Sequence, residues 1–346
     1  MSQSAANLPL LPTSVVGSYA KPSWFCTAMD AVRRGEYGST DIRETLGDAT
    51  NIAILDQERA GVDVISDGEM QRQDFIMGFF DRLDGLKPIE PTRRQGSAGY
   101  DQISTFVAVE KLYAPTGLGI VKEFEYAKNR TSRPIKVTCP GPLTLSFRID
   151  PGDAYKDSED MAFTMARIVN SELRALVAAG ASFIQIDEPR YANFPEGGRQ
   201  WSDLFNETVK GVDAKLALHI CFGNYQNRPA SRRSYRPMFP SILDIKADQL
   251  VLEFTNREMS EIDLWKEFPS DKELGAGVID VKSYYIEKPQ EVAERVRYLL
   301  QYVAPEKLWI NPDCGFNHTP RWVSEAKLHA MVEGTRMVRH ELKGSH

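Results

Sequence analysis

The chain has 346 residues, of which 42% are hydrophobic and 26% charged, with a net charge of -6 and a pI of about 5.6. This is an ordinary globular composition, and its acidic balance argues against a general nucleic-acid-binding surface. No apolar run reaches the ~18 residues of a membrane span, no secretory signal is visible, and four cysteines do not suggest a disulfide framework. We therefore expect a cytoplasmic protein.

Short β-rich runs alternate with longer helical patterns along the chain. Strands are predicted at Thr13–Gly17, Val62–Ser66, Ile135–Cys139, Phe183–Asp187, Lys215–Cys221, Gln249–Glu253, Glu273–Ile279 and Lys307–Asn311. Helices are predicted at Asp41–Ala60, with Thr40 as its N-cap, and at Ser158–Ala179, Trp201–Val212, Ser260–Glu267, Pro289–Val303 and Pro320–Val338.

Eight strands that alternate with helices predict an α/β fold, a single (β/α)8 TIM barrel. Several of the strands are almost continuously apolar, which is typical of a parallel sheet buried on both faces. We expect one domain over residues 1–343, whereas residues 344–346 resemble the remnant of a cloning tag.

Two segments are longer than the strand–helix repeat of a minimal barrel requires. Residues 72–133 are expected to form an insertion over the barrel mouth, with a loop at Arg93–Tyr100 and part of a hairpin at Ile103–Tyr113. The segment Asn227–Met238 follows the fifth strand and carries four arginines, which suit either an anion site or a solvated loop. These arginines are Arg228, Arg232, Arg233 and Arg236.

A possible metal site starts from the spacing His219-Ile220-Cys221. On a strand, residues i and i+2 point to the same side, so the imidazole and the thiol can reach one ion. Alone, this spacing more often marks a core histidine beside a buried free cysteine. Glu253 and Cys314 close two further predicted strands, however, and barrel chemistry lies at the carboxyl ends of strands. The four side chains therefore predict a zinc site that activates a thiol, with Glu253 as the displaceable ligand.

Other polar residues follow the remaining predicted strands. Asp280 suits either a catalytic carboxylate or the N-cap of the next helix. The others, in chain order, are Gly17-Ser18, Asp67-Gly68-Glu69, Asp187-Glu188 and Asp313.

Taken together, these motifs resemble the zinc-dependent catalytic barrel of cobalamin-independent methionine synthase, which is one of that enzyme's two barrels. The resemblance covers nearly the whole chain. It is carried by Val16-Gly17-Ser18, Ser66-Asp67-Gly68-Glu69-Met70-Gln71-Arg72, Gly141-Pro142-Leu143-Thr144, Ile184-Gln185-Ile186-Asp187-Glu188-Pro189, His219-Ile220-Cys221, Glu253 and Asn311-Pro312-Asp313-Cys314-Gly315.

The resemblance implies four zinc ligands, His219, Cys221, Glu253 and Cys314, and methyl transfer to homocysteine. It implies a pocket for the amino acid part of homocysteine formed by Gly17 and Ser18 with Glu69 and Asp187. Two carboxylates suit an ammonium group. The alternative for Glu69 and Asp187 is ion pairing with Arg72 or Arg190.

The sequence departs from the family pattern at two positions. Phe147 stands where the family has a tryptophan that stacks on the pterin of the folate donor. Lys282, close to Asp280, stands near a family histidine that works in proton transfer; it could be a general acid, an anion ligand or a solvated lysine. The methyl donor is therefore left open between methyltetrahydrofolate and a methylcorrinoid, the latter implying a possible corrinoid protein as partner.

The sequence leaves three other functions open. An epoxyalkane:coenzyme M transferase would use a zinc-bound thiolate to open an epoxide, with coenzyme M as the thiol. A non-catalytic zinc-binding or corrinoid-partner protein is a second alternative, and a uroporphyrinogen decarboxylase-like barrel, which needs no zinc, is a third. The sequence does not predict the oligomeric state.

Overall fold

A six-stranded parallel sheet forms the centre of the molecule. The computed structural model describes residues 8–72, 75–90, 105–224 and 227–344. The strands follow the order β3-β5-β6-β7-β8-β9, and every neighbouring pair is parallel. The predicted α/β fold is therefore confirmed. The strand bounds are β3 Val137–Pro140, β5 Phe183–Asp187, β6 Lys215–Ile220, β7 Gln249–Leu252, β8 Glu273–Ile279 and β9 Leu308–Pro312.

The first two predicted strands are present only as isolated parallel bridges. Thr13 bridges to Ile310 of β9, Ser14 to Val64, and Ile65 to Ile135 just before β3. These bridges join the two edges of the six-stranded sheet, which supports the predicted barrel. Thr13–Gly17 and Val62–Ser66 were wrong as full strands because side chains take some of their backbone hydrogen bonds. The N–H of Thr13 donates to Asp63 at 2.9 Å, and that of Ser66 to Gln57 at 3.0 Å.

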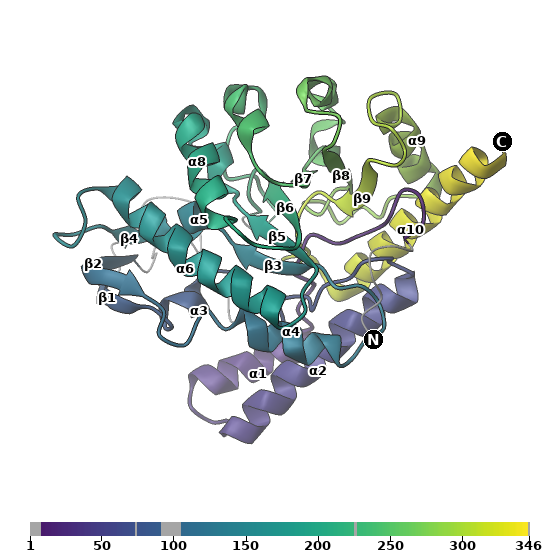
Figure 1. Ribbon diagram of the computed structural model, residues 1–346. Helices are drawn as coiled ribbons and strands as arrows, with labels where there is room; N and C mark the ends of the chain where they lie inside the picture. Colours follow the sequence, from purple (N-terminus) through teal and green to yellow (C-terminus); the bar gives the residue numbers. More distant parts are fainter. Residues whose placement is uncertain (1–7, 73–74, 91–104, 225–226, 345–346) are drawn as a thin grey trace.

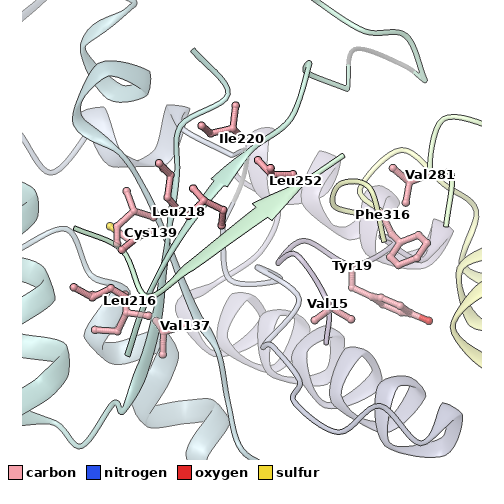
Figure 2. Packing of buried hydrophobic residues seen from close by; sticks show 14 of the residues in the cluster. Val15, Tyr19, Val137, Cys139, Leu216, Leu218, Ile220, Leu252, Val281 and Phe316 are labelled. Carbon is pink, nitrogen blue, oxygen red and sulfur yellow. The ribbon is translucent and has the colours of Figure 1, made fainter. Parts of the chain in front are cut away.

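The sheet separates two layers of apolar side chains. A small cluster unites Val16, Val64, Phe183, Ala217, Val251 and Trp309, which come from six positions around the sheet. The larger core includes Leu216, Leu218 and Ile220, which alternate along β6 with Ala217 and His219. Figure 2 shows these leucines near Val137 and Cys139. Because alternate residues point to opposite faces, His219 points to the inner side with Ala217.

Most predicted helices are present, with shifted ends. The bounds are α2 Ser39–Ala60, α6 Ser158–Ala178, α8 Arg199–Thr208, α9 Pro289–Leu299 and α10 Arg321–Gly344. The N-cap of α2 is Gly38 and not Thr40, because the Asp41 carboxylate accepts the Gly38 N–H at 2.8 Å. Ser260–Glu267 was wrong as an α-helix. Only a 3-10 helix, η6 Ile262–Glu267, forms there, after three residues with positive φ, Glu258, Met259 and Glu261.

Several short elements were not predicted. They are α1 Ser23–Arg33, α5 Pro142–Ser146, α7 Arg190–Asn193, η2 Pro195–Gly197, η3 Arg236–Met238, η4 Ser241–Asp244 and η5 Thr255–Arg257. Within the described ranges, no helix combines the length and apolar character needed to cross a bilayer.

The inserted segment builds a small second sheet. β1 Asp84–Ile89 pairs antiparallel with β2 Thr105–Tyr113, and β4 Ile149–Asp150 joins β2 in parallel. The predicted hairpin element is thus confirmed, whereas Arg93–Tyr100 lies outside the described residues. This sheet and α3 Met77–Phe80 lie at the left of Figure 1, away from α9 and α10. α4 Ile120–Lys128 packs against α2 and α6, so it serves as an ordinary barrel helix and the insertion ends before it.

Candidate active site

A cavity of about 250 Å³ lies at the carboxyl ends of the strands. This is the end at which TIM-barrel enzymes carry their chemistry. Phe75 and Ile76 of the inserted segment also line it, so the insertion borders the predicted site. Six of the predicted site residues line its wall, namely Ser18, Glu69, Asp187, His219, Cys221 and Cys314.

Three of these residues form a possible metal site. The ligand atoms of His219, Cys221 and Cys314 lie within 4.8 Å of one another, and the two Sγ atoms are 3.4 Å apart. His219 Nδ1 lies 3.0 Å from the carbonyl oxygen of Val251, which orients the ring. The buried Nε2 has no hydrogen-bond partner among the described residues. A buried nitrogen without a hydrogen-bond partner, together with two sulfurs, forms the donor set expected for a metal ion.

The two thiols differ in acidity. Their hydrogen bond is the main cause that lowers the pKa of Cys314 and raises the pKa of Cys221, and burial raises the latter further. The nearby His219 also lowers the pKa of Cys314. Cys314 is therefore the thiol that loses its proton first, and a thiolate is the form that binds metals.

Glu253, the predicted fourth ligand, is not gathered with this trio. Its Oε1 is 2.6 Å from Lys282 Nζ, and its Oε2 accepts the Phe222 N–H at 3.1 Å. The Glu253 side chain is 0% exposed and that of Lys282 2%. Burial would lower the pKa of Lys282, but the Glu253 carboxylate together with the nearby Cys314 and Cys221 outweighs this effect and raises that pKa. Both carboxylate oxygens thus have protein partners, which distinguishes Glu253 from the three gathered ligands.

Glu69 and Asp187 supply the carboxylates of the cavity. Glu69 accepts a hydrogen bond from Thr138 Oγ1 at 2.8 Å and lies 3.3 Å from Arg72, so the alternative ion pair is present. Asp187 accepts from Gln185 Nε2 at 2.7 Å. Burial raises the pKa of Asp187 to about 7; it also raises the pKa of Glu69, against the opposing effect of Arg72. Two buried carboxylates with one nearby guanidinium favour a cationic ligand.

The backbone around Glu69 is tightly constrained. Glu69 itself has φ 56°, an uncommon conformation for a non-glycine residue and one often found at functional sites. A Cβ at position 17 would lie only 2.6 Å from Glu69 Oε1, so Gly17 is the residue that allows this approach. Gly17 therefore shapes the cavity through its lack of a side chain, while its neighbour Ser18 lines the wall.

The side chains of the adjacent residues Asp187 and Glu188 lie in different surroundings. Asp187 lines the cavity, whereas Glu188 accepts the N–H groups of Leu143 and Thr144 at 2.9 and 3.0 Å, at the start of α5. A Cβ at Gly141 would fall 2.2 Å from Glu188, so this glycine admits the carboxylate. The Gly141–Thr144 motif and Glu188 therefore form one structural unit that holds α5 beside the pocket.

Phe147 and Asp280 also lie away from the cavity wall. Phe147 is 43% exposed, and the Arg190 guanidinium covers its ring with its central carbon 3.3 Å from the ring centroid. Asp280 accepts the Lys282 N–H at 2.8 Å and contacts the Asn256 amide at 3.3 Å. Asp280 thus shapes the turn that carries Lys282. The predicted alternative, the N-cap of the next helix, was wrong, because Lys288 is the N-cap of α9.

Several residues around the site were not predicted. Thr138 and Gln185 orient Glu69 and Asp187, and Gln185 could have been found from its i, i+2 spacing to Asp187. Other residues line the cavity although the sequence did not predict this position for them. They are Lys21, Arg72, Arg148, Asn224 and His318. They come from separate segments, and no local pattern links them.

The predicted arginine cluster is exposed and pairs partly with the next loop. Arg233 donates to the Asn256 carbonyl at 2.7 Å, and Arg236 lies 2.8 Å from Glu267. Arg228 and Arg232 are also exposed. The solvated-loop alternative therefore describes these side chains.

The family described as "Cobalamin-independent synthase, Catalytic domain" matches residues 11–337. The methionine synthase of Saccharolobus solfataricus is 38% identical over 339 residues, covering 98% of each chain. That of Sulfurisphaera tokodaii is 37% identical over 337 residues, covering 97% of this chain and 95% of the relative.

Solved structures agree with these matches. A B12-independent methionine synthase from Shewanella sp. W3-18-1, in complex with selenomethionine, superposes with a TM-score of 0.82 at 28% identity. The superposition covers 97% of this chain and 99% of that one. The chain belongs to the cobalamin-independent methionine synthase family.

Proposed function

We propose that this protein transfers a methyl group to the thiol of homocysteine and so forms methionine. The observation that carries this proposal is one cavity in which a His-Cys-Cys trio faces two carboxylates, Glu69 and Asp187. The trio suits the sulfur end of homocysteine, and the carboxylates suit its ammonium group. The Shewanella relative holds selenomethionine, whose amino acid part is that of the proposed product.

The metal proposed for this site is zinc, held by His219, Cys221 and Cys314, with Glu253 as an exchangeable fourth ligand. Zinc would keep the substrate thiol deprotonated at neutral pH, which makes it a nucleophile. The trio fits this metal because its donors are one imidazole and two thiols, and the only open nitrogen, Nε2, is buried beside the sulfurs.

The remaining residues bind and orient the substrate in this proposal. Glu69 and Asp187 accept hydrogen bonds from the ammonium group, while the backbone and hydroxyl at Gly17 and Ser18 face the carboxylate. Arg72 favours the ionised form of Glu69 through their 3.3 Å contact, against the opposing effect of burial. Together these contacts would hold the thiol at the His-Cys-Cys end of the cavity.

Lys282 is proposed to receive the Glu253 carboxylate when the thiol displaces it. The buried 2.6 Å ion pair supports this role, because a displaced carboxylate needs a compensating charge inside the protein. Asp280 assists by holding the turn that carries Lys282. This replaces a general-acid role for Lys282, because Glu253 raises the pKa of the ammonium group and so holds its proton.

The alkyl donor is proposed to be a methylated cofactor, either methyltetrahydrofolate or a methylcorrinoid presented by a partner protein. Phe147 gives little support to pterin stacking, since Arg190 lies on its ring. Coenzyme M is a poorer thiol candidate than homocysteine, because its sulfonate would meet the Glu69 and Asp187 carboxylates. The four free cysteines support the reducing cytoplasm as the compartment.

Titration of the zinc-loaded protein with thiols tests the proposal. Homocysteine should bind with release of a proton, and coenzyme M should bind at least tenfold more weakly, whereas Glu69→Gln should reduce this preference. Methyl transfer to homocysteine is then measured with each methyl donor. Preferential binding of coenzyme M would contradict the assignment, and zinc binding without transfer from any donor would favour a non-catalytic role.

A further inference from the structure

One side chain of the Asn227–Met238 loop, Tyr235, points back to the ends of β6 and β7. Tyr235 is 2% exposed, in contrast to the exposed arginines on either side of it. Its ring packs against Phe222 at a centroid distance of 4.6 Å and against Phe254 at 6.1 Å. Phe222 follows Cys221 and Phe254 follows Glu253, so the ring lies between the ends of β6 and β7.

The Tyr235 hydroxyl hydrogen-bonds to both strand ends. It accepts the N–H of Glu253 at 2.7 Å and donates to the carbonyl of Ile220 at 3.0 Å, with the Glu253 carbonyl also within 3.2 Å. Ile220 is the residue between His219 and Cys221. One hydroxyl therefore ties the backbone of the His-x-Cys pair to the backbone of Glu253.

Separate contacts hold Tyr235 in this place. Glu261 accepts the Tyr235 N–H at 2.8 Å, and Arg257 pairs with Glu261 at 2.6 Å. The Arg257 guanidinium also lies 5.3 Å from the Tyr235 ring. Because the loop is anchored through its backbone, loss of the hydroxyl alone should leave its path intact.

We propose that Tyr235 is a positioning residue that fixes the separation between Glu253 and the His219-Ile220-Cys221 segment, and thereby the geometry of the metal site. This inference rests on the proposed metal-dependent function. Groups that orient metal ligands typically contribute tenfold or more to metal affinity. The Asn227–Met238 loop then delivers this hydroxyl to the strand ends, while its arginines lie at the surface.

The test compares Tyr235→Phe with Tyr191→Phe. Tyr191 is also 2% exposed and donates its hydroxyl to a backbone carbonyl, that of Trp201 at 2.9 Å, but it belongs to α7. Each variant therefore loses one buried hydroxyl, and unfolding in urea after metal removal by a chelator checks that both remain folded. Zinc affinity is measured by competition with a chromophoric chelator, and coordination geometry by the visible absorption of the cobalt-loaded proteins.

Tyr235→Phe should bind zinc about tenfold more weakly than wild type and show a changed cobalt spectrum. Tyr191→Phe should match the wild type in both measurements. Equal zinc affinities and spectra in the two variants would overturn the role of Tyr235. Wild-type protein that binds zinc but transfers no methyl group would refute the proposed function alone, whereas wild-type protein that binds neither metal would refute both proposals.

Discussion

The buried pair of Lys282 and Glu253 offers the sharpest test of how this site is assembled. The two side chains are 2% and 0% exposed, and Nζ lies 2.6 Å from Oε1. Lys282→Met keeps much of the side-chain volume but leaves the Glu253 carboxylate buried without its cation. Breaking a buried ion pair in this way typically costs about 3–5 kcal/mol of unfolding free energy. We expect a loss of this order in protein treated with a chelator.

Urea unfolding of the chelator-treated variants measures this loss. Lys111→Met is the control, because Lys111 pairs with Asp160 at 3.1 Å with both side chains largely exposed, and such solvent-screened pairs contribute little to stability. Glu253→Gln in the Lys282→Met background should recover part of the stability, since the uncompensated charge is gone.

Zinc should then stabilise Lys282→Met more than it stabilises the wild type. In this variant Glu253 has lost its Lys282 partner, so the metal becomes its first cation. A ligand that binds only the folded state raises the unfolding free energy. A Lys282→Met protein no less stable than Lys111→Met would refute the reasoning, as would equal stabilisation of variant and wild type by zinc.

Three further predictions concern the ligands, the substrate carboxylates and a buried lysine. Cys221→Ser should lose zinc and methyl transfer together, as measured by metal content and turnover; normal turnover without metal would contradict the mechanism. Glu69→Gln should raise the KM for homocysteine by about 10- to 100-fold, the range for a hydrogen bond to a charged group, with a smaller effect on kcat; an unchanged KM would remove Glu69 from the substrate site. Burial lowers the pKa of Lys136 to about 7 from a usual 10.5, so the unfolded chain binds more protons between these values and stability should rise with pH across that window. Lys136→Met should reduce this slope in urea unfolding at pH 7 and 9.5, and an unchanged slope would assign it to other groups.

The positions of the His-Cys-Cys trio were predictable because they depend on strand ends. His219 lies in β6, and Cys221 and Cys314 follow β6 and β9 within two residues. In a parallel sheet all carboxyl ends lie on one edge, so recognising the strands is enough to bring such residues together. The spacing of two residues between His219 and Cys221 then places both on the inner side. The same reasoning placed Glu69 and Asp187 in the cavity.

Strand lengths and helix starts were less predictable, because side chains compete for backbone groups. Asp63 and Gln57 take N–H groups that would otherwise extend the first two strands, and Asp41 moves the N-cap of α2 to Gly38. Such competition depends on which side chain reaches which N–H after folding. The apolar pattern of the sequence does not reveal this competition.

The contacts that set the chemistry of this site come from loops, where neither periodicity nor strand order indicates proximity. Lys282 reaches Glu253 from the turn after β8, and Tyr235 reaches the same residue from the loop after β6. One contact satisfies the carboxylate and the other holds its backbone. Glu253 is therefore kept beside the His-Cys-Cys trio by groups that bind it independently of any metal. If Glu253 is the fourth zinc ligand, as proposed, a carboxylate held in this way would keep its place in the protein when a substrate thiol replaced it.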